Sequence, residues 1–290
     1  MKKLLFTIFI LSCLLASGQA GSEIFLFDIK VTNGQVVLSN GSNITNHMGY
    51  DNQPFFHPSK PLIYYSSFND NGPSDIKYYD YQKRKTFNLT ITSESEYSPT
   101  VTPDQKFISC IIQRDNGVQD LGKYPVNGGK PQVLINDLKV GYHAWADKNN
   151  LLLFVLIDSA TNNLHYHNLP AKTDTVIAVN PGRSLHKIPG QNAMSFIQKN
   201  AGKDWVIKRV DLKTKVISSI VPTMAGQENL VWLINNIILM SSGAKLFSYQ
   251  VGTDKEWQPV IIEGDTEMLK GFSRLATNGS NTKLAVVVAE

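Results

Sequence analysis

Short runs of apolar and β-branched residues recur along most of the chain, with clusters of Gly, Asn, Asp and Pro between them. Helical periodicity is weak throughout. Runs of four to eight such residues bounded by turn residues are typical of β-strands. The pattern therefore predicts an all-β protein.

The runs form a repeat. Each copy has a short segment that ends in an apolar anchor residue and leads into a turn, as in "PFFHPSK" and "PTVTPDQK". The anchors are Phe56, Val101, Trp145, Ile188, Trp232 and Leu275, at separations of 45, 44, 43, 44 and 43 residues. A period of about 44 residues over six copies is typical of repeat architectures.

Within a copy, the anchor segment is followed by three further strand-like runs, for example "PLIYYSS", "IKYYD" and "KTFNLTI". Four strands per repeat is the composition of a β-propeller blade, whose faces are buried only against neighbouring blades. We predict a six-bladed β-propeller of four-stranded blades and regard an irregular β-sandwich as the alternative.

The sixth copy ends after its second run, "KLAVVVAE", whereas the stretch "EIFLFDIKVTNGQVVLSN" near the start of the chain belongs to no copy. That stretch reads as a β-hairpin turning at Asn33-Gly34. We expect residues 24–28 and 34–38 to supply the third and fourth strands of the last blade. Pairing the N-terminal hairpin with the C-terminal strands would close the ring and remove its open edges.

Residues 1–20 combine Lys2 and Lys3 with an apolar run and a small-residue end, which is typical of a signal peptide. We expect cleavage after Ala20 rather than lipidation at Cys13. The propeller domain is then 21–290, in a periplasmic or secreted protein that is not membrane-spanning. Cys110 is the only cysteine after the leader, so no internal disulfide is expected.

Removal of the leader leaves 26 basic and 24 acidic residues, a net charge of +2. A charge balance this even gives no support for nucleic acid as a partner. We expect a monomer.

The repeats "PFFHPSKPLIYYSSFNDNGPSDIKYYDYQ" and "SPTVTPDQKFISCIIQRDNGVQDLGKYPVNGGKPQVLI" resemble the WD40-like repeats of the TolB type. Pro103-Asp104 matches the family's turn, and the run from Asp75 to Asp80 matches its third strand. The resemblance implies a six-bladed propeller of the periplasm that binds partner proteins of the envelope. Full-length TolB proteins carry an α/β domain ahead of the propeller, and the repeats of this sequence begin directly after the leader.

Catalytic motifs are missing from the sequence: there is no nucleophile elbow, no zinc-binding helix motif and no phosphate loop. His165 and His167 lie two residues apart on a predicted third strand, where they would share a face. No third ligand is identifiable, and a role as polar residues of an outer strand is favoured over a metal site. We expect no metal, no cofactor and no catalytic residues.

The segments that precede the first strands cross from the rim of one blade to the axis of the next, so their side chains are expected to converge at one mouth of the channel. These candidate binding residues are Tyr50, Asp51, Tyr97, Tyr142, His143, Arg183, His186 and Glu228. Tyrosine and arginine bury large areas while keeping a polar tip, which suits recognition of a partner.

The sequence therefore favours an exported, non-catalytic binding or scaffold protein that recognises a protein, peptide or glycan at the channel face. The alternative is a propeller hydrolase of the lactonase or glycosidase type with its site at the channel mouth. Such an enzyme needs acids or metal ligands gathered from several blades, and only Asp51 and Glu228 stand close before a first strand.

Overall fold

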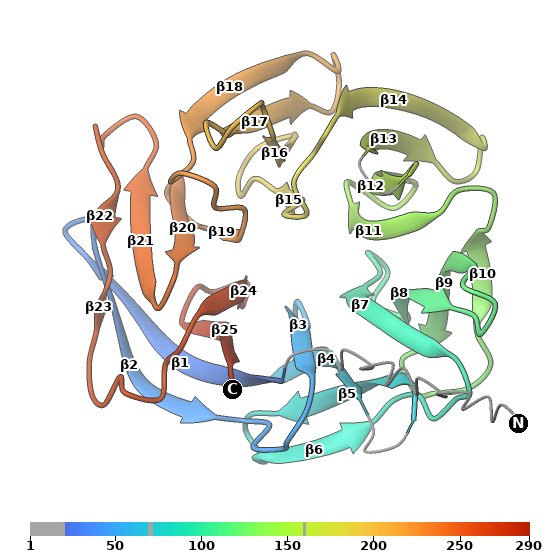
Figure 1. Ribbon diagram of the computed structural model, residues 1–290, viewed down its shortest axis with the longest axis horizontal. Helices are drawn as coiled ribbons and strands as arrows, with labels where there is room; N and C mark the ends of the chain where they lie inside the picture. Colours follow the sequence, from blue (N-terminus) through green and yellow to red (C-terminus); the bar gives the residue numbers. More distant parts are fainter. Residues whose placement is uncertain (1–20, 69–71, 159–160) are drawn as a thin grey trace, which may run out of the picture.

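The computed structural model describes residues 21–68, 72–158 and 161–290. All its regular elements are β-strands, and they form six sheets arranged around a central axis (Figure 1). None of the described residues forms a helix long and apolar enough to cross a membrane. The leader expected at residues 1–20 lies outside the described ranges.

Five sheets are blades of four consecutive antiparallel strands. The first two blades contain β3 (Asp51–Phe56), β4 (Leu62–Phe68), β5 (Ser74–Asp80), β6 (Lys85–Asn88), β7 (Ser95–Val101), β8 (Phe107–Gln113), β9 (Gln119–Pro125) and β10 (Gln132–Ile135). The third and fourth contain β11 (Val140–Trp145), β12 (Asn150–Leu156), β13 (Asn162–Asn168), β14 (Thr173–Val179), β15 (His186–Lys187), β16 (Ala193–Gln198), β17 (Val206–Asp211) and β18 (Ile217–Pro222). The fifth contains β19 (Leu230–Leu233), β20 (Ile237–Ser242), β21 (Lys245–Gln250) and β22 (Gln258–Pro259).

The sixth sheet joins the two ends of the described chain. Its order is β23 (Ile261–Ile262), β2 (Gln35–Asn43), β1 (Ser22–Thr32), β25 (Lys283–Ala289) and β24 (Phe272–Thr277). β1 pairs antiparallel with β25 over seven residue pairs, from Ser22 opposite Ala289 to Asp28 opposite Lys283. The closure predicted from the orphan hairpin is confirmed. We call the β1–β25 pairing the clasp.

The turn of the hairpin follows from its residues. Asn33 has φ 51° and Gly34 has φ 80°. A two-residue turn with positive φ at both central positions is the type I′ turn, whose twist matches that of the flanking strands, and Asn-Gly is its preferred sequence.

Alternation along β1 lets the clasp sheet pack on both faces. Phe25 and Phe27 join the apolar cluster shared with the fifth blade. Ile24 and Leu26 join the cluster shared with the first blade. Successive side chains of a strand point to opposite faces, so one strand completes two contacts between blades.

The fifth blade differs from the prediction. Four strands were expected in each blade, but the run "EWQPVII" is divided between two sheets: β22 pairs with β21, whereas β23 pairs in parallel with β2 of the next sheet. Pro259 lies at the break, where it has no N–H to donate. The backbone N–H of Glu263 bonds to the carbonyl of Leu38 at 2.8 Å. The last blade therefore gains a fifth strand that covers part of the outer edge of β2.

Candidate functional site

The innermost strands of the six sheets, β3, β7, β11, β15, β19 and β24, surround the axis (Figure 1). Four of them, β3, β7, β11 and β24, contain a β-bulge next to the channel. In the first two blades the bulge holds Gln53 at φ 57° and Ser98 at φ 54°, each directly before a proline. A bulge turns the following side chains relative to simple alternation, so these strands can present several residues to the channel.

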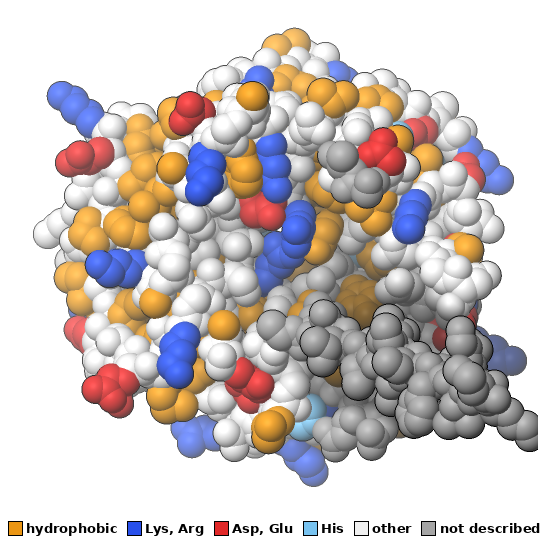
Figure 2. Space-filling view, viewed as in Figure 1, with side chains coloured by type: hydrophobic (Ala, Val, Ile, Leu, Met, Phe, Trp, Pro, Cys, Tyr) orange, Lys and Arg blue, Asp and Glu red, His pale blue; other side chains and the backbone are white. Residues whose placement is uncertain are grey.

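Three adjoining hollows define the mouth of the channel, with volumes of about 130, 420 and 240 Å³. Tyr142 and Arg183 line all three. Basic side chains lie near the centre of the face seen in Figure 2, with an acidic one beside them.

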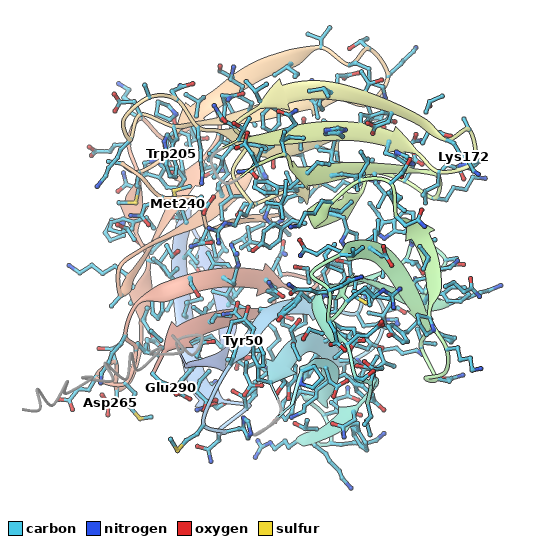
Figure 3. All side chains as sticks on the ribbon, turned by 45° about the vertical axis from the view of Figure 1, so that its right-hand side comes forward. Tyr50, Lys172, Trp205, Met240, Asp265 and Glu290 are labelled. Carbon is cyan, nitrogen blue, oxygen red and sulfur yellow. The ribbon has the colours of Figure 1, made fainter. Side chains whose placement is uncertain are left out.

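Seven of the eight residues expected at the mouth line these hollows. Those seven are Tyr50, Tyr97, Tyr142, His143, Arg183, His186 and Glu228. In Figure 3, Tyr50 lies in the interior of the molecule, whereas Lys172 lies at its outer edge. The segments that cross between blades therefore bring these seven side chains to the three hollows.

Asp51 is placed differently. Its side chain is buried, with a residue exposure of 1%, and its backbone carbonyl accepts a hydrogen bond from Ser22 of the clasp at 3.1 Å. Burial raises the pKa of Asp51 to about 6. Asp51 thus lies beneath the surface of the mouth, close to the start of β1.

Glu228 carries the carboxylate of the mouth. Lys199 Nζ lies 2.8 Å from its Oε2, and Arg183 Nε lies 3.4 Å from its Oε1. The backbone N–H of Arg183 also donates to Oε2 at 3.1 Å. Burial by itself would raise the pKa of Glu228, but the hydrogen bond and charge of Lys199 together with the Arg183 contacts lower it. Glu228 is therefore ionised at neutral pH.

Gly182 makes room for this carboxylate. A Cβ added there would lie 3.3 Å from Glu228 Oε2 and 3.0 Å from Ile197 Cβ. Glycine is thus the residue that lets the backbone approach the acid closely.

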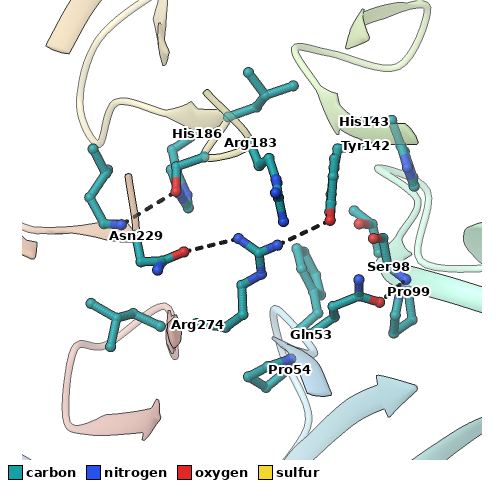
Figure 4. Close-up of a pocket in the computed structure, with 16 residues that line it drawn as sticks. Gln53, Pro54, Ser98, Pro99, Tyr142, His143, Arg183, His186, Asn229 and Arg274 are labelled. Carbon is teal, nitrogen blue, oxygen red and sulfur yellow. Dashed lines mark hydrogen bonds between the residues drawn. The ribbon is translucent and has the colours of Figure 1, made fainter. Parts of the chain in front are cut away.

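Arg274 reaches the centre of the mouth from β24. Its Nη1 donates to Asn229 Oδ1 at 2.9 Å and its Nη2 donates to the Tyr142 hydroxyl at 3.0 Å, as Figure 4 shows. Its guanidinium also lies 5.2 Å from the centre of the Tyr142 ring. These three contacts hold the arginine in one orientation.

Sequence reasoning missed Arg274, Asn229 and Lys199. Arg274 directly precedes the anchor Leu275, whereas the candidates were sought two to six positions before an anchor. Extending that window by one position would have found Arg274. Asn229 was inside the window, but an asparagine there carries no distinctive signal. Lys199 follows the second strand of its blade and reaches the mouth only through the length of its side chain.

The two channel histidines are neutral. Burial lowers the pKa of His143 to about 3 and that of His186 to about 4. His143 Nε2 lies 2.8 Å from Ser109 Oγ, which is the contact a serine hydrolase would need. Ser109 is fully buried, however, and its hydroxyl also bonds to the Thr100 carbonyl at 3.0 Å and to Trp145 Nε1 at 2.9 Å. This hydroxyl joins the second and third blades and is not presented to a substrate.

His165 and His167 share a face, as expected from their spacing, and both are buried. Asp174 of β14 lies between them, with Oδ2 at 2.6 Å from His165 Nδ1 and Oδ1 at 3.3 Å from His167 Nδ1. Among the described residues no group of three or more His, Cys, Asp or Glu side chains is arranged to hold a metal ion. The pair therefore lies in a hydrogen-bonded contact between β13 and β14.

No protein-family model and no curated protein matches the sequence. Solved structures match the fold. A protein described as TolB from Agrobacterium tumefaciens aligns with a TM-score of 0.69 at 12% identity over 94% of this chain and 99% of that one. A chain of a nidogen–laminin complex aligns with a TM-score of 0.66 at 6% identity over 88% and 98%.

TolB from Acinetobacter baumannii aligns with a TM-score of 0.58 at 10% identity, covering 93% of this chain and 64% of that protein. Together with the six sheets described above, these alignments show that the chain has the fold of a TolB-like six-bladed propeller. Sequence identities this low show a shared fold and do not show a shared function.

Proposed function

We propose that this chain is an exported, non-catalytic binding or scaffold protein of the periplasm or cell exterior, which recognises a protein, peptide or glycan at the mouth of its channel. The observation that carries the proposal is the convergence of Tyr50, Tyr97, Tyr142, Arg183 and Arg274 on one opening. Tyrosine and arginine are the side chains that dominate binding energy at recognition surfaces.

The tyrosines are held in place by aromatic contacts. The Tyr50 and Phe68 ring centres are 5.2 Å apart, and the Phe68 and Tyr97 ring centres are 6.2 Å apart. Tyr142 packs edge-on against Phe154 at 5.6 Å. A rigid aromatic surface loses little conformational entropy when a partner binds, which favours affinity.

Binding is favoured over hydrolysis because of the chemistry at the mouth. Glu228 is the one carboxylate among the described residues that line the three hollows, and it is already paired with Lys199 and Arg183. A glycosidase mechanism of the common type uses two carboxyl groups that flank the bond to be cleaved. The hypothesis of a hydrolase therefore has less support than the hypothesis of a binding protein.

The test is affinity capture from the envelope fraction of the source cell, with the wild-type protein and a Tyr97→Ala/Tyr142→Ala variant as baits. We expect one or more stoichiometric partners with the wild type and at least about a ten-fold loss with the variant, or about 1.4 kcal/mol. A matched control is Tyr81→Ala, which removes a half-buried tyrosine that packs on Phe56 away from the mouth. Equal capture by the mouth variant and the wild type would refute the proposed face.

A further inference from the structure

The charges at the mouth do not balance. Three cations, Arg183, Lys199 and Arg274, and one carboxylate, Glu228, line the three hollows in the part of the chain that the structure describes. Clefts lined by an excess of one charge attract ligands of the opposite charge. The mouth is therefore suited to an anionic group.

Of the three cations at the mouth, Arg274 is the one that forms no ion pair with a carboxylate of the described residues. Glu228 is shared by Lys199 and Arg183, whereas the printed hydrogen-bond partners of Arg274 are the neutral Asn229 and Tyr142 side chains. No Asp or Glu of the described ranges lies within 4.0 Å of the Arg274 guanidinium nitrogens. Asn229 and Tyr142 orient this guanidinium without neutralising it.

The geometry leaves donors available. A guanidinium has five N–H groups, and the contacts of Arg274 occupy one on each terminal nitrogen. Its planar fork matches a carboxylate, which can accept two parallel hydrogen bonds. Arg274 lines two of the three hollows, and Arg183, whose side chain is 48% exposed, lines both of these as well. A carboxylate entering there would meet two arginines.

The channel becomes apolar below the mouth. A further hollow of about 340 Å³ shares Phe55, Leu185 and Leu275 with the mouth and continues to Trp145 and Val231. His143 and His186, which line both parts, are neutral because burial lowers the pKa of each well below neutral pH. The lower channel thus offers mostly apolar surface, and Lys187 is the one charged side chain among the described residues that line it.

We infer that the ligand of this mouth is a peptide segment whose carboxylate is held by Arg274 and Arg183, with an apolar side chain next to it in the lower channel. The inference rests on the proposed binding function and names the chemistry of its ligand. The carboxylate is either a chain terminus or an Asp or Glu side chain, and the experiment separates these two sources.

The test uses three pools of N-acetylated pentapeptides built from randomised uncharged residues. The first pool has free C-terminal carboxylates. The second has amidated C-termini and a fixed central Glu, and the third is amidated with no acidic residue. Each pool is passed over the immobilised protein, residues 21–290, and the retained peptides are quantified by mass spectrometry.

We expect one carboxylate pool to be retained roughly ten-fold more than the neutral pool, and the excess to fall at high salt. The better of the two pools identifies the source of the carboxylate, and apolar residues should be enriched beside it. Arg274→Gln should abolish the excess, and Arg274→Lys should retain part of it because it keeps the charge without the fork. The control is Lys213→Gln, which removes the same charge from the exposed turn between β17 and β18. Thermal unfolding of each variant confirms that it is folded.

Equal retention of all three pools, retention of none, or an excess that persists in a folded Arg274→Gln protein would overturn the inference. The proposed function is tested separately from the carboxylate. A partner that is captured by the wild type and lost with the Tyr97→Ala/Tyr142→Ala variant would uphold binding at the mouth even where the carboxylate pools show no excess.

Discussion

Two glutamates show how the channel mouth differs from the contacts between blades. Glu228 at the mouth lies against Lys199 and Arg183, and these contacts lower its pKa. Glu96, between the first and second blades, is fully buried and accepts hydrogen bonds from Tyr124, Thr92 and Thr90 at 2.9, 2.8 and 3.1 Å. Burial raises the pKa of Glu96 to about 7.

The difference teaches how the ring divides its tasks. Glu96 is held by hydroxyl groups in a buried contact, and burial favours its uncharged form because an unpaired charge is costly to bury. At the mouth, Lys199 and Arg183 favour the ionised form of Glu228, and the Arg183 side chain is 48% exposed, where a ligand can reach it. Changes in the blade contacts should therefore alter stability, and changes at the mouth should alter binding with little effect on stability.

The largest effect is expected from removal of the clasp. Deletion of residues 23–38 takes away most of β1 and part of β2, which leaves β25 paired with β24 alone and uncovers apolar residues of two clusters. We expect aggregation, or a fall in the unfolding temperature of more than about 15 °C, measured by calorimetry and light scattering. A soluble deletion protein that unfolds at the wild-type temperature would remove the clasp from the account.

The second effect concerns an anchor. Trp232 is 4% exposed and its Nε1 donates to Ser195 Oγ at 2.8 Å, which joins the fourth and fifth blades. Trp232→Ala should lower the free energy of unfolding by about 3–5 kcal/mol in denaturant titrations. A double-mutant cycle between Trp232→Phe and Ser195→Ala should give a coupling of about 1 kcal/mol for the hydrogen bond itself. No measurable coupling would mean that this bond does not hold the two blades together.

The third effect depends on pH. The folded pKa of Glu96, about 7, lies above its unfolded value, so the stability contributed by its protonated form is present at acid pH and is lost as the pH rises through 7. The glutamine of Glu96→Gln has no carboxyl group to ionise, so this variant does not lose that stability as the pH rises. Its free energy of unfolding relative to wild type should therefore increase by about 3 kcal/mol from about pH 4.5 to about pH 7 and then level off.

Glu228→Gln is the matched control, with the opposite sign. The folded pKa of Glu228 is lowered, so its contribution is present at neutral pH and is lost as the pH falls. This variant should be slightly less stable than wild type at pH 7, and the difference should vanish in acid. Parallel pH profiles for the two variants would contradict the contrast between the two regions.

The smallest effect on stability is expected at the mouth. Tyr142→Phe removes the hydroxyl that accepts a hydrogen bond from Arg274 and keeps the ring. Because this hydroxyl lies beside an open hollow, water can replace it, and the free energy of unfolding should change by less than about 1 kcal/mol. A loss of several kcal/mol would show that the mouth is a structural contact like those between blades.

Much of the fold could be predicted from the sequence, because six apolar anchors at nearly constant spacing and one orphan hairpin leave few ways to bury the strands. The two-residue strand β23 could not be predicted. Its parallel pairing with β2 covers only two residue pairs, Val37 with Ile261 and Leu38 with Ile262, which is too short to leave a pattern in the sequence.

The site was predicted only in part. The repeat places Tyr50, Tyr142 and Arg183 near the channel because crossing segments converge there. It does not show that Asp51 is buried, because bulges in the innermost strands change which side chains face the axis. Nor does it show the reach of Lys199 and Arg274, which depends on long side chains and on the neutral partners that orient the arginine.

The most direct test of binding at the mouth is amide hydrogen exchange of the protein with and without a captured partner. The account predicts new protection in residues 50–53, 97–100, 141–143, 183–186, 228–230 and 273–275, with the outer strands β6, β10, β14 and β18 unchanged. Protection confined to the outer strands, with the mouth segments exchanging as in the free protein, would contradict it.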